Sequence, residues 1–290
     1  MKKLIAGMLS LAILAAAALT GCNAGGANGS ISISGSSALY PLVNVAAADF
    51  KTDNKDVSMS VQAGGSGTGL NNVRAKTVDI GMSDVYASEK PAAGFDDSAL
   101  IDHQVCLIGV TVIVNADVGA TVTNLTTDQL KGIFNGQTTN WQAVGGPDED
   151  ITVVNRPSSS GTRALFEKWA LGGAASDDTA QNTDDSNQLM AMVGSTKGSI
   201  GYLALSYMNT APATVSKVQL NGVDATNENI YNNSYPVWGY EHMYTNGEAT
   251  GVVKAFIDYM TSPAMQTKAE TLGYGAVAKL NAAAVASHKP

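Results

Sequence analysis

Three short apolar segments of this chain each run into a turn of small residues and then into a helical pattern. The expected strands cover residues 31–34, 57–62 and 151–155, and the helices after them cover about 37–50, 67–75 and 161–170. Repeated strand–turn–helix order predicts an α/β fold with mostly parallel sheets. In such folds ligands bind beyond the carboxyl ends of the strands, so we expect a site at these turns.

The rest of the chain carries the same alternation of patterns. Residues 104–115 form a long, apolar, β-branched run of the kind found in buried strands. Residues 126–134 have the period of an amphipathic helix, with Thr126 in the N-cap position. We also expect a strand at 78–82, helices at 186–193, 249–260 and 263–272, and an exposed loop at 176–187.

Four segments at or near these turns combine small residues with hydroxyl groups or a charge. They are residues 35–38, 65–69 and 81–84, and Arg156 with residues 160–162. Three of them precede an expected helix, whose unpaired N–H groups and dipole attract anions. Taken singly, their serines are more typical of caps and turns than of ligands. Together, because they come from different strands, they predict a pocket for a tetrahedral oxyanion in a cleft between domains.

Arg156 and Asp84 indicate which oxyanion this would be. The Arg156 guanidinium can donate two hydrogen bonds to one phosphate or carboxylate group. A carboxylate beside an anion is repulsive unless the ligand carries a proton that it can donate. Asp84 therefore favours phosphate, which carries a proton at neutral pH, over sulfate, which does not. The same carboxylate can also pair with Arg156 and hold the guanidinium in place.

The first 22 residues have the pattern of an export signal. Lys2 and Lys3 precede an apolar run that ends in Leu-Thr-Gly before Cys22, which is typical of a lipoprotein signal peptide lipidated at that cysteine. The alternative is a membrane-spanning helix, but the run is short for a span, and residues 23–30 form a Gly/Ala/Asn/Ser tether. We therefore expect an exported protein that a lipid on Cys22 holds at the extracytoplasmic side of the cell membrane. The remaining chain, about 260 residues, suffices for one large or two medium domains.

The amino-acid composition excludes several classes of binding partner and cofactor. The formal charge of −8 argues against nucleic acid, which binds basic surfaces. Cys106 is left without a second cysteine once Cys22 is lipidated, and its apolar neighbours predict a buried thiol. His103, His242 and His288 lack metal-ligand spacing, and we expect no metal, no cofactor and no catalytic residue.

Two other functions fit the same residues less well. A receptor for sulfate would leave Asp84 without a role, because sulfate brings no proton to it. An exported phosphatase or other hydrolase would need an activated nucleophile. The sequence Gly65-Ser66-Gly67 differs by one position from the Gly-x-Ser-x-Gly pattern, and the histidines have no evident orienting partner.

Six segments together form a specific set of motifs. They are residues 34–41 (SGSSALYP), 64–69 (GGSGTG), 78–84 (VDIGMSD), 125–136 (LTTDQLKGIFNG, continued by Asn140-Trp141), 156–163 (RPSSSGTR) and 198–202 (GSIGY). In this order they resemble the phosphate-binding lipoproteins of phosphate ABC transporters, within the type II periplasmic-binding-protein class. The similarity covers nearly all of the chain after Cys22.

The resemblance implies a two-lobed type II periplasmic-binding-protein fold with two hinge crossovers and an interdomain cleft that closes on one phosphate ion. The first lobe would comprise residues 31–110 and 238–290 and the second 111–237, with crossovers near 109–112 and 235–240. The role implied is a receptor that serves a membrane permease and is not an enzyme. The resemblance also implies which residues bind the phosphate. In the first segment these are Ser37 and Ala38, through their backbone N–H groups, with Ser36 or Leu39 as alternatives. The others are Ser66, Asp84, Arg156, Ser160, Gly161 and Thr162.

Overall fold

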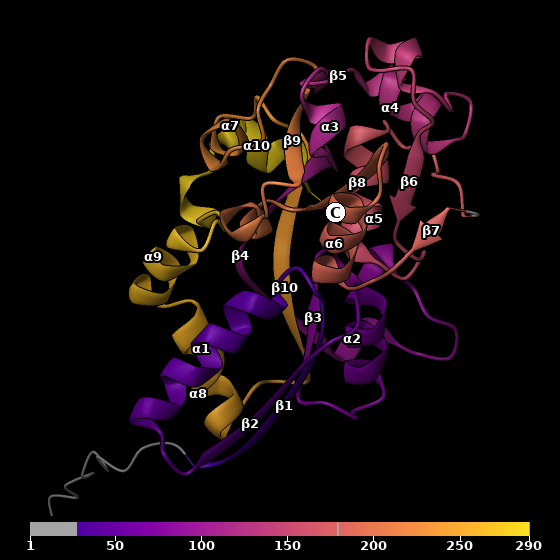
Figure 1. Cartoon of the computed structure of the whole chain (residues 1–290). Coiled ribbons are helices and arrows are strands. Elements are labelled where there is room, and N and C mark those ends of the chain that lie inside the picture. The colour runs from indigo at the N-terminus through magenta and orange to yellow at the C-terminus, as the bar shows by residue number, and fades with distance from the viewer. Residues whose placement is uncertain (1–27, 179, 290) are drawn as a thin grey trace, which may run out of the picture.

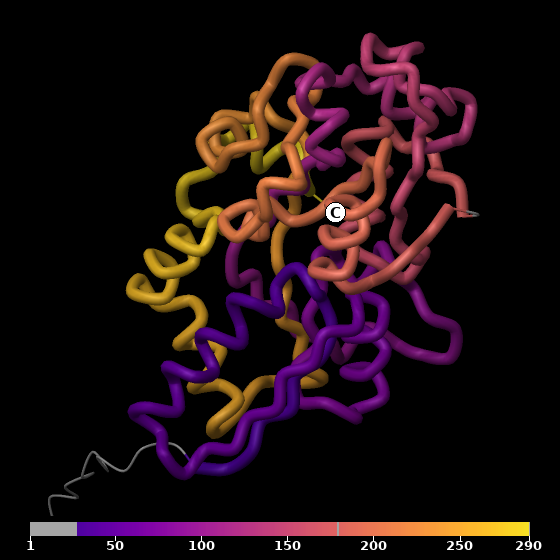
Figure 2. Tube along the Cα trace, viewed as in Figure 1, coloured from indigo at the N-terminus to yellow at the C-terminus, as the bar shows by residue number. Residues whose placement is uncertain are grey.

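The computed structural model of this 290-residue chain describes residues 28–178 and 180–289, which form two lobes. Two long strands, β4 (Leu100–Asn115) and β10 (Trp238–Asn246), run between the lobes (Figure 1). The Cα trace in Figure 2 shows that the lower lobe is built from both the indigo N-terminal part and the orange-to-yellow C-terminal part of the chain. Among the described residues, no helix combines the length and apolar character needed to cross a membrane.

The first lobe, which is the lower one in Figure 1, is built around a three-stranded parallel unit in the order β2–β1–β3. Strand β1 shows why the sequence folds this way, since Ile31 and Ile33 alternate with serines and are buried. Phe50 and Phe256, which come from two different helices of this lobe, pack edge to face with ring centroids 5.4 Å apart. The elements of this lobe are β1 (Gly29–Gly35), α1 (Tyr40–Asp53), β2 (Val57–Ala63), α2 (Ser66–Arg74), β3 (Ile80–Ser83), α8 (Gly251–Met260) and α9 (Pro263–Thr271).

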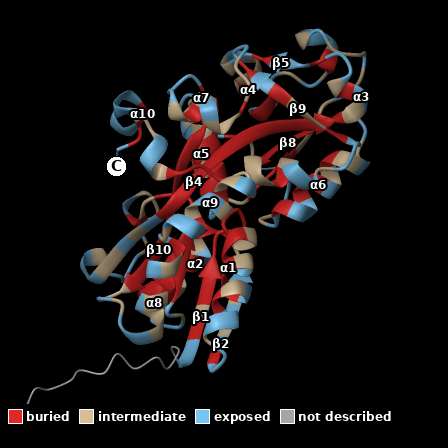
Figure 3. Ribbon diagram, turned by 90° about the vertical axis from the view of Figure 1, so that its left-hand side faces the viewer, coloured by how far each residue is buried: buried red, intermediate tan, exposed pale blue. Residues whose placement is uncertain are grey.

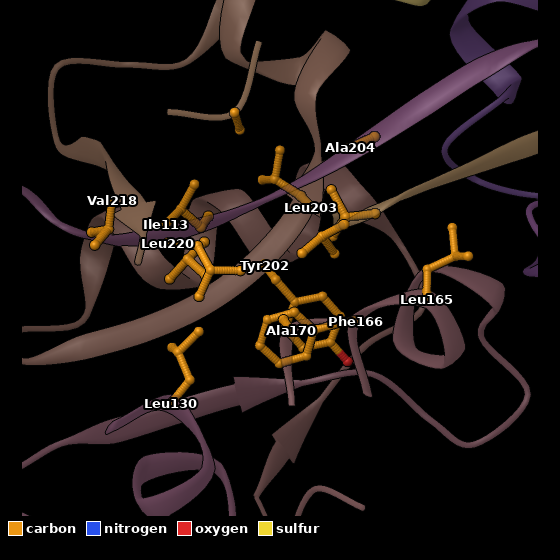
Figure 4. Close-up of a cluster of buried hydrophobic side chains, with 14 of the residues drawn as sticks. Ile113, Leu130, Leu165, Phe166, Ala170, Tyr202, Leu203, Ala204, Val218 and Leu220 are labelled. Carbon is orange, nitrogen blue, oxygen red and sulfur yellow. The ribbon is translucent and has the colours of Figure 1, made fainter. Parts of the chain in front are cut away.

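The second lobe has a larger apolar core, part of which Figure 4 shows. Phe166 and Tyr202 stack there with ring centroids 4.0 Å apart, and the Tyr202 hydroxyl donates a hydrogen bond to Asn155 Oδ1 at 2.7 Å. Its strands are β5 (Asn124–Leu125), β6 (Thr152–Asn155), β7 (Gln181–Asn182), β8 (Ser199–Ala204) and β9 (Val215–Leu220). Its helices include α3 (Ala116–Gly119), α4 (Thr127–Phe134), α5 (Gly161–Leu165), α6 (Ser186–Ser195) and α7 (Asn227–Tyr231).

Strand β4 belongs to both lobes because its partners change along its length. Residues 100–109 pair with β10, whereas Val110 to Asn115 pair with β8 and β9. Figure 3 shows this strand passing, largely buried, from one lobe to the other. The change of partner falls inside the first predicted crossover, and the second predicted crossover includes the start of β10. One hydrogen bond joins the two crossovers: the Tyr235 hydroxyl donates to the Val110 carbonyl oxygen at 2.8 Å.

Several local expectations need correction. The sheets are mixed instead of mostly parallel, because β10 and the second half of β4 pair antiparallel with their neighbours. Gly29 and Ser30 belong to β1 instead of the expected tether, since they pair in register with β2. The expected helix 161–170 is α-helical only to Leu165 and continues as a π-helical turn over Phe166–Ala170. The signal peptide, Cys22 and most of the tether lie outside the described residues.

The C-terminal segment packs against the second lobe, although it belongs to the span predicted for the first. Helix α10 (Ala282–Ser287) contributes Ala284 to the core cluster of the second lobe. His288 then stacks between Trp169 and Trp238, with ring centroids 4.0 and 3.8 Å away. The histidine is therefore a packing residue that fastens the C-terminus across the start of β10.

Candidate functional site

The residues predicted to bind an anion meet between the two lobes, and all eight are buried. Ser37, Ala38, Ser66 and Asp84 come from the first lobe, at or just after the carboxyl ends of β1, β2 and β3. Arg156 and residues 160–162 come from the second lobe, where β6 ends and α5 begins. The turns after the strands thus face one another, as expected for a site at the carboxyl ends of strands.

The turn after β1 is held by serine and tyrosine hydroxyls. Ser36 Oγ accepts hydrogen bonds from the backbone N–H groups of Ala38 at 3.1 Å and Leu39 at 2.9 Å. The Tyr207 hydroxyl, from the second lobe, donates to the carbonyl oxygen of Ser37 at 2.7 Å. The Tyr274 hydroxyl donates to the carbonyl oxygen of Ala38 at 2.6 Å. In this conformation the Ala38 N–H, a predicted ligand donor, is directed to Ser36, and the side chain of Ser37 faces the second lobe.

The glycine-rich turn at the start of α2 brings the backbones of the two lobes into contact. Gly65 has a positive φ of 81°, a backbone conformation that favours glycine, and a Cβ there would also overlap the Asp184 carboxylate. The backbone N–H of Gly67 donates to the carbonyl oxygen of Ser159, in the opposite lobe, at 3.0 Å. This turn therefore packs directly against the segment that carries the predicted ligands of the second lobe.

Arg156 is completely buried at the end of β6. Its Nη2 donates to Ser186 Oγ at 2.9 Å, and its Nη1 lies 3.4 Å from Ser37 Oγ and 3.3 Å from the Asp184 carbonyl oxygen. The carboxylate beside it belongs to Asp184, at 3.9 Å from Nη1. The predicted pairing of Arg156 with Asp84 is therefore wrong, because Asp184 occupies that place. The Nε donor has no hydrogen-bond partner among the described residues.

Asp84 is held by hydroxyl groups from both lobes. The Thr162 hydroxyl donates to Asp84 Oδ2 at 2.6 Å across the cleft, and the Asp84 backbone N–H donates to Ser66 Oγ at 2.9 Å. Asp84 Oδ1 is buried and meets no hydrogen-bond donor in the described part of the chain. The cleft thus contains a buried carboxylate oxygen with free acceptor capacity, in the same site as the buried guanidinium.

Two residues of this site lie in the segment that was expected to be an exposed loop. Asp184 and Ser186 both contact Arg156, and Ser186 is buried, so that expectation is wrong for them. Burial raises the pKa of the Asp184 carboxyl, while the Arg156 charge and a hydrogen bond from Ser160 oppose the shift. A sequence signal did exist. Asp185 caps α6 by accepting the Gln188 N–H at 2.7 Å, the same kind of polar helix start as in the other segments.

Further contacts hold the lobes together around the site. Lys90 Nζ donates to the carbonyl oxygen of Ser158 at 2.5 Å, and Lys168 pairs with Glu89 at 2.8 Å. Burial lowers the pKa of Lys90. Beside the site, a pocket of about 390 Å³ opens between the lobes. Residues of both lobes line it, among them Ser37 and Gln62 from one and Asp185 and Tyr207 from the other.

The chain has clear relatives. A family model described as a PBP superfamily domain matches residues 23–264. The phosphate-binding protein PstS of Bacillus subtilis is 48% identical over 240 residues, which cover 83% of this chain and 78% of that protein.

Solved structures agree with this relationship. A substrate-binding protein described for a phosphate ABC transporter of Clostridium perfringens, with bound phosphate, has a TM-score of 0.77 and 32% identity, and the match covers 86% of this chain and 100% of that one. An ABC-type phosphate transport receptor from Vibrio cholerae has a TM-score of 0.66 and 28% identity, over 84% and 99% of the two chains. This chain therefore belongs to the PBP superfamily, in the family that includes the phosphate-binding protein PstS of Bacillus subtilis.

Proposed function

We propose that this protein is an extracytoplasmic receptor that binds inorganic phosphate between its two lobes and delivers it to a phosphate ABC permease. The observation that carries the proposal is the presence of a buried guanidinium and a buried carboxylate with acceptor capacity in one cleft. Arg156 supplies the charge-assisted hydrogen bonds that an oxyanion needs. Asp84 supplies an acceptor that only a protonated oxyanion can use.

The selectivity of this receptor follows from desolvation. At neutral pH phosphate keeps at least one proton, which it can donate to Asp84, whereas sulfate has none to donate. A sulfate ion in the cleft would set two acceptors against each other with no water between them, at a cost of order 1–3 kcal/mol or more for the unmade hydrogen bond. Rejection of sulfate therefore requires no steric difference between the two ions.

Capture requires that the lobes move together. The proposed ligand groups come from both lobes, so only the closed arrangement lets Ser37, Ser66 and Asp84 reach the same ion as Arg156 and Thr162. A ligand that interacts with both lobes shifts the population toward the closed state. The crossover at β4 and β10 is where the connecting strands would bend.

The proposal includes an N-terminal lipid anchor. The lipobox-like sequence before Cys22 supports cleavage and lipidation there. Only a short segment separates Cys22 from β1, which begins at Gly29. A short tether would keep the receptor close to the membrane that holds its permease. Labelling with a radioactive fatty acid in the host cell, abolished by Cys22→Ser, tests this part of the proposal.

Calorimetric titration of the protein, stripped of bound ligand, tests the binding function. We expect one phosphate to bind per chain, with no heat from sulfate. Binding of sulfate with equal affinity would contradict the role of Asp84. Binding of neither ion, together with turnover of a chromogenic phosphate ester, would contradict the receptor and support a hydrolase.

A further inference from the structure

Glu241 is a second buried carboxyl group behind the proposed site. It lies on β10, where its register partner is Cys106 on β4, and none of its surface is exposed. Neither of its carboxyl oxygens has a hydrogen-bond donor among the described residues. Burying a carboxylate without a donor or a cation costs several kcal/mol, so this group needs a different explanation from the solvent-exposed acids of the chain.

The group that faces Glu241 is Asp84. On the antiparallel pair of β10 and β3, His242 lies opposite Ser83, so Glu241, one residue earlier on β10, comes opposite Asp84, one residue after β3 ends. Burial raises the pKa of Glu241 well above its ordinary value, and the charge of Asp84 raises it further. Two carboxylates cannot hydrogen-bond to each other unless one of them carries a proton, because both are then acceptors only. The free oxygen of Asp84, Oδ1, is also without a donor. A single proton on Glu241 would give Asp84 Oδ1 a donor and remove the charge from Glu241.

The other titratable groups around the pair do not provide a positive charge for Glu241. Cys106, on β4, and Tyr274, after α9, are the groups whose pKa values Glu241 raises, and burial keeps both neutral. Asp84 also interacts through charge with Lys90 of its own lobe and with Asp184 and Tyr207 of the second lobe. Lys90 is the cation among these groups. It lies on the side of Asp84 that faces the cleft and does not contribute to the raised pKa of Glu241.

We propose that Glu241 is a positioning residue for Asp84: it stays a neutral carboxylic acid and donates a hydrogen bond to the Asp84 carboxylate. Thr162 holds the other carboxylate oxygen at 2.6 Å, so each oxygen of Asp84 has its own donor and the orientation of the carboxylate is fixed. Both donors also stabilise the ionised form of Asp84. A carboxylate oxygen has two lone pairs, so Asp84 Oδ1 can accept a hydrogen bond from Glu241 and still accept the ligand's proton. The second carboxyl, being neutral, adds no charge that would repel the anion.

This inference rests on the proposed function and explains how the selectivity for a protonated oxyanion survives at low pH. If Asp84 took up a proton, it could donate to sulfate and the discrimination would fail. Removing the Glu241 donor should make Asp84 easier to protonate, so sulfate binding should begin at a higher pH. If Glu241 were instead ionised, removing it would take away a negative charge and have the opposite effect.

The test measures sulfate and phosphate binding from about pH 8 down to about pH 3.5, a range that includes the ordinary pKa of an aspartate, near 3.9. In Glu241→Leu, which has no donor, we expect the onset of sulfate binding to move up by about one to two pH units, the size expected for loss of one hydrogen bond to a charged group. In Glu241→Gln, whose amide can still donate to Asp84, the onset should match that of the unmodified protein. Rescue by glutamine separates hydrogen-bond donation from a merely structural role.

Either of two results would overturn the inference. One is an onset in Glu241→Leu that is absent or no higher than in the unmodified protein. The other is a glutamine variant that shifts together with the leucine variant. Since both variants are measured beside the unmodified protein, a failure of the latter to bind phosphate refutes the proposed function instead.

Infrared spectroscopy gives a second readout that does not depend on ligand binding. At neutral pH ordinary carboxyls are ionised, so a carbonyl stretching band of a protonated carboxylic acid reports an unusual group. We expect this band in the unmodified protein, its loss in Glu241→Gln, and its retention in the control Glu248→Gln, which alters an exposed glutamate just after the same strand. A band that is absent from the unmodified protein, or that survives in Glu241→Gln, contradicts a neutral Glu241.

Discussion

Replacing Gly161 with alanine tests whether capture depends on closure of the lobes. Gly161 is the first residue of α5, and a Cβ there would overlap Ser66 Oγ and lie 2.8 Å from Ser66 Cβ and 3.0 Å from Asp84 Cβ. All three atoms belong to the opposite lobe, and carbon atoms normally approach only to about 3.5 Å. The added methyl group therefore penalises the closed arrangement, while each lobe can still fold around its own core.

The size of the effect follows from the cost of overpacking. An extra methyl group in a well-packed interior costs about 1–3 kcal/mol, which corresponds to phosphate binding about 5-fold to 150-fold weaker. The backbone N–H of residue 161, a proposed ligand, is retained by alanine. The ligand-free protein should be as stable as before or slightly more so, because alanine is the better helix former.

The assay pairs calorimetric titration with thermal unfolding of the ligand-free protein. Gly64→Ala is the matched control, because the closest neighbour of its added Cβ is a Thr68 methyl group at 3.3 Å in the same lobe. We expect the control to bind phosphate within about twofold of the unmodified protein, a change of less than half a kcal/mol. Unchanged affinity in Gly161→Ala would refute the reasoning, as would a loss of affinity matched by an equal loss of ligand-free stability.

Three further predictions concern single side chains. Asp84→Asn supplies an amide donor where the carboxylate only accepts, so calorimetry should detect sulfate binding and phosphate binding about tenfold weaker; an unchanged preference would contradict the selectivity argument. Arg156→Lys should weaken phosphate binding about 10-fold to 100-fold in the same assay, because an ammonium group cannot replace a guanidinium that hydrogen-bonds through both Nη1 and Nη2. Near-normal affinity of this variant would show that Arg156 does not bind the phosphate. Burial lowers the pKa of His288 to about 4, below its ordinary value near 6.5, so the protein should lose stability as pH falls through that window. His288→Phe should remove up to about 3 kcal/mol of this loss in urea unfolding at several pH values, and an unchanged pH dependence would show that His288 is not its source.

Local patterns were sufficient for many elements of this fold. Thr126 and Gln129 form both hydrogen bonds of a capping box at the start of α4, at the place where the sequence indicates it. The alternating serines and isoleucines of β1 likewise predict a strand with one buried face. These signals are readable because caps and strand faces depend on residues within a few positions of one another.

Strand β10 shows where local reading fails. It contains Glu241 and His242, which are both fully buried. Because these residues are polar, the sequence pattern does not indicate a strand in the middle of a sheet. Its antiparallel pairing with β3 and β4 joins segments that are far apart in sequence, and no periodicity within nine residues reveals it. The same holds for the position of Glu241 opposite Asp84, which follows from the antiparallel register of β10 and β3.

The sequence alone determined which chemical groups the site contains: small residues at strand ends, an arginine suited to bind a buried anion, and an aspartate that suits a protonated ligand. Only the tertiary structure decided which groups meet. Asp84 meets Thr162 across 78 residues of chain, and Ser37 meets the Asp184 carbonyl across 147. Such contacts depend on how two separately folded lobes dock, and docking is a property of their whole surfaces. For that reason the sequence suggested Asp84 as the partner of Arg156, whereas the fold places Asp184 there and Glu241 opposite Asp84.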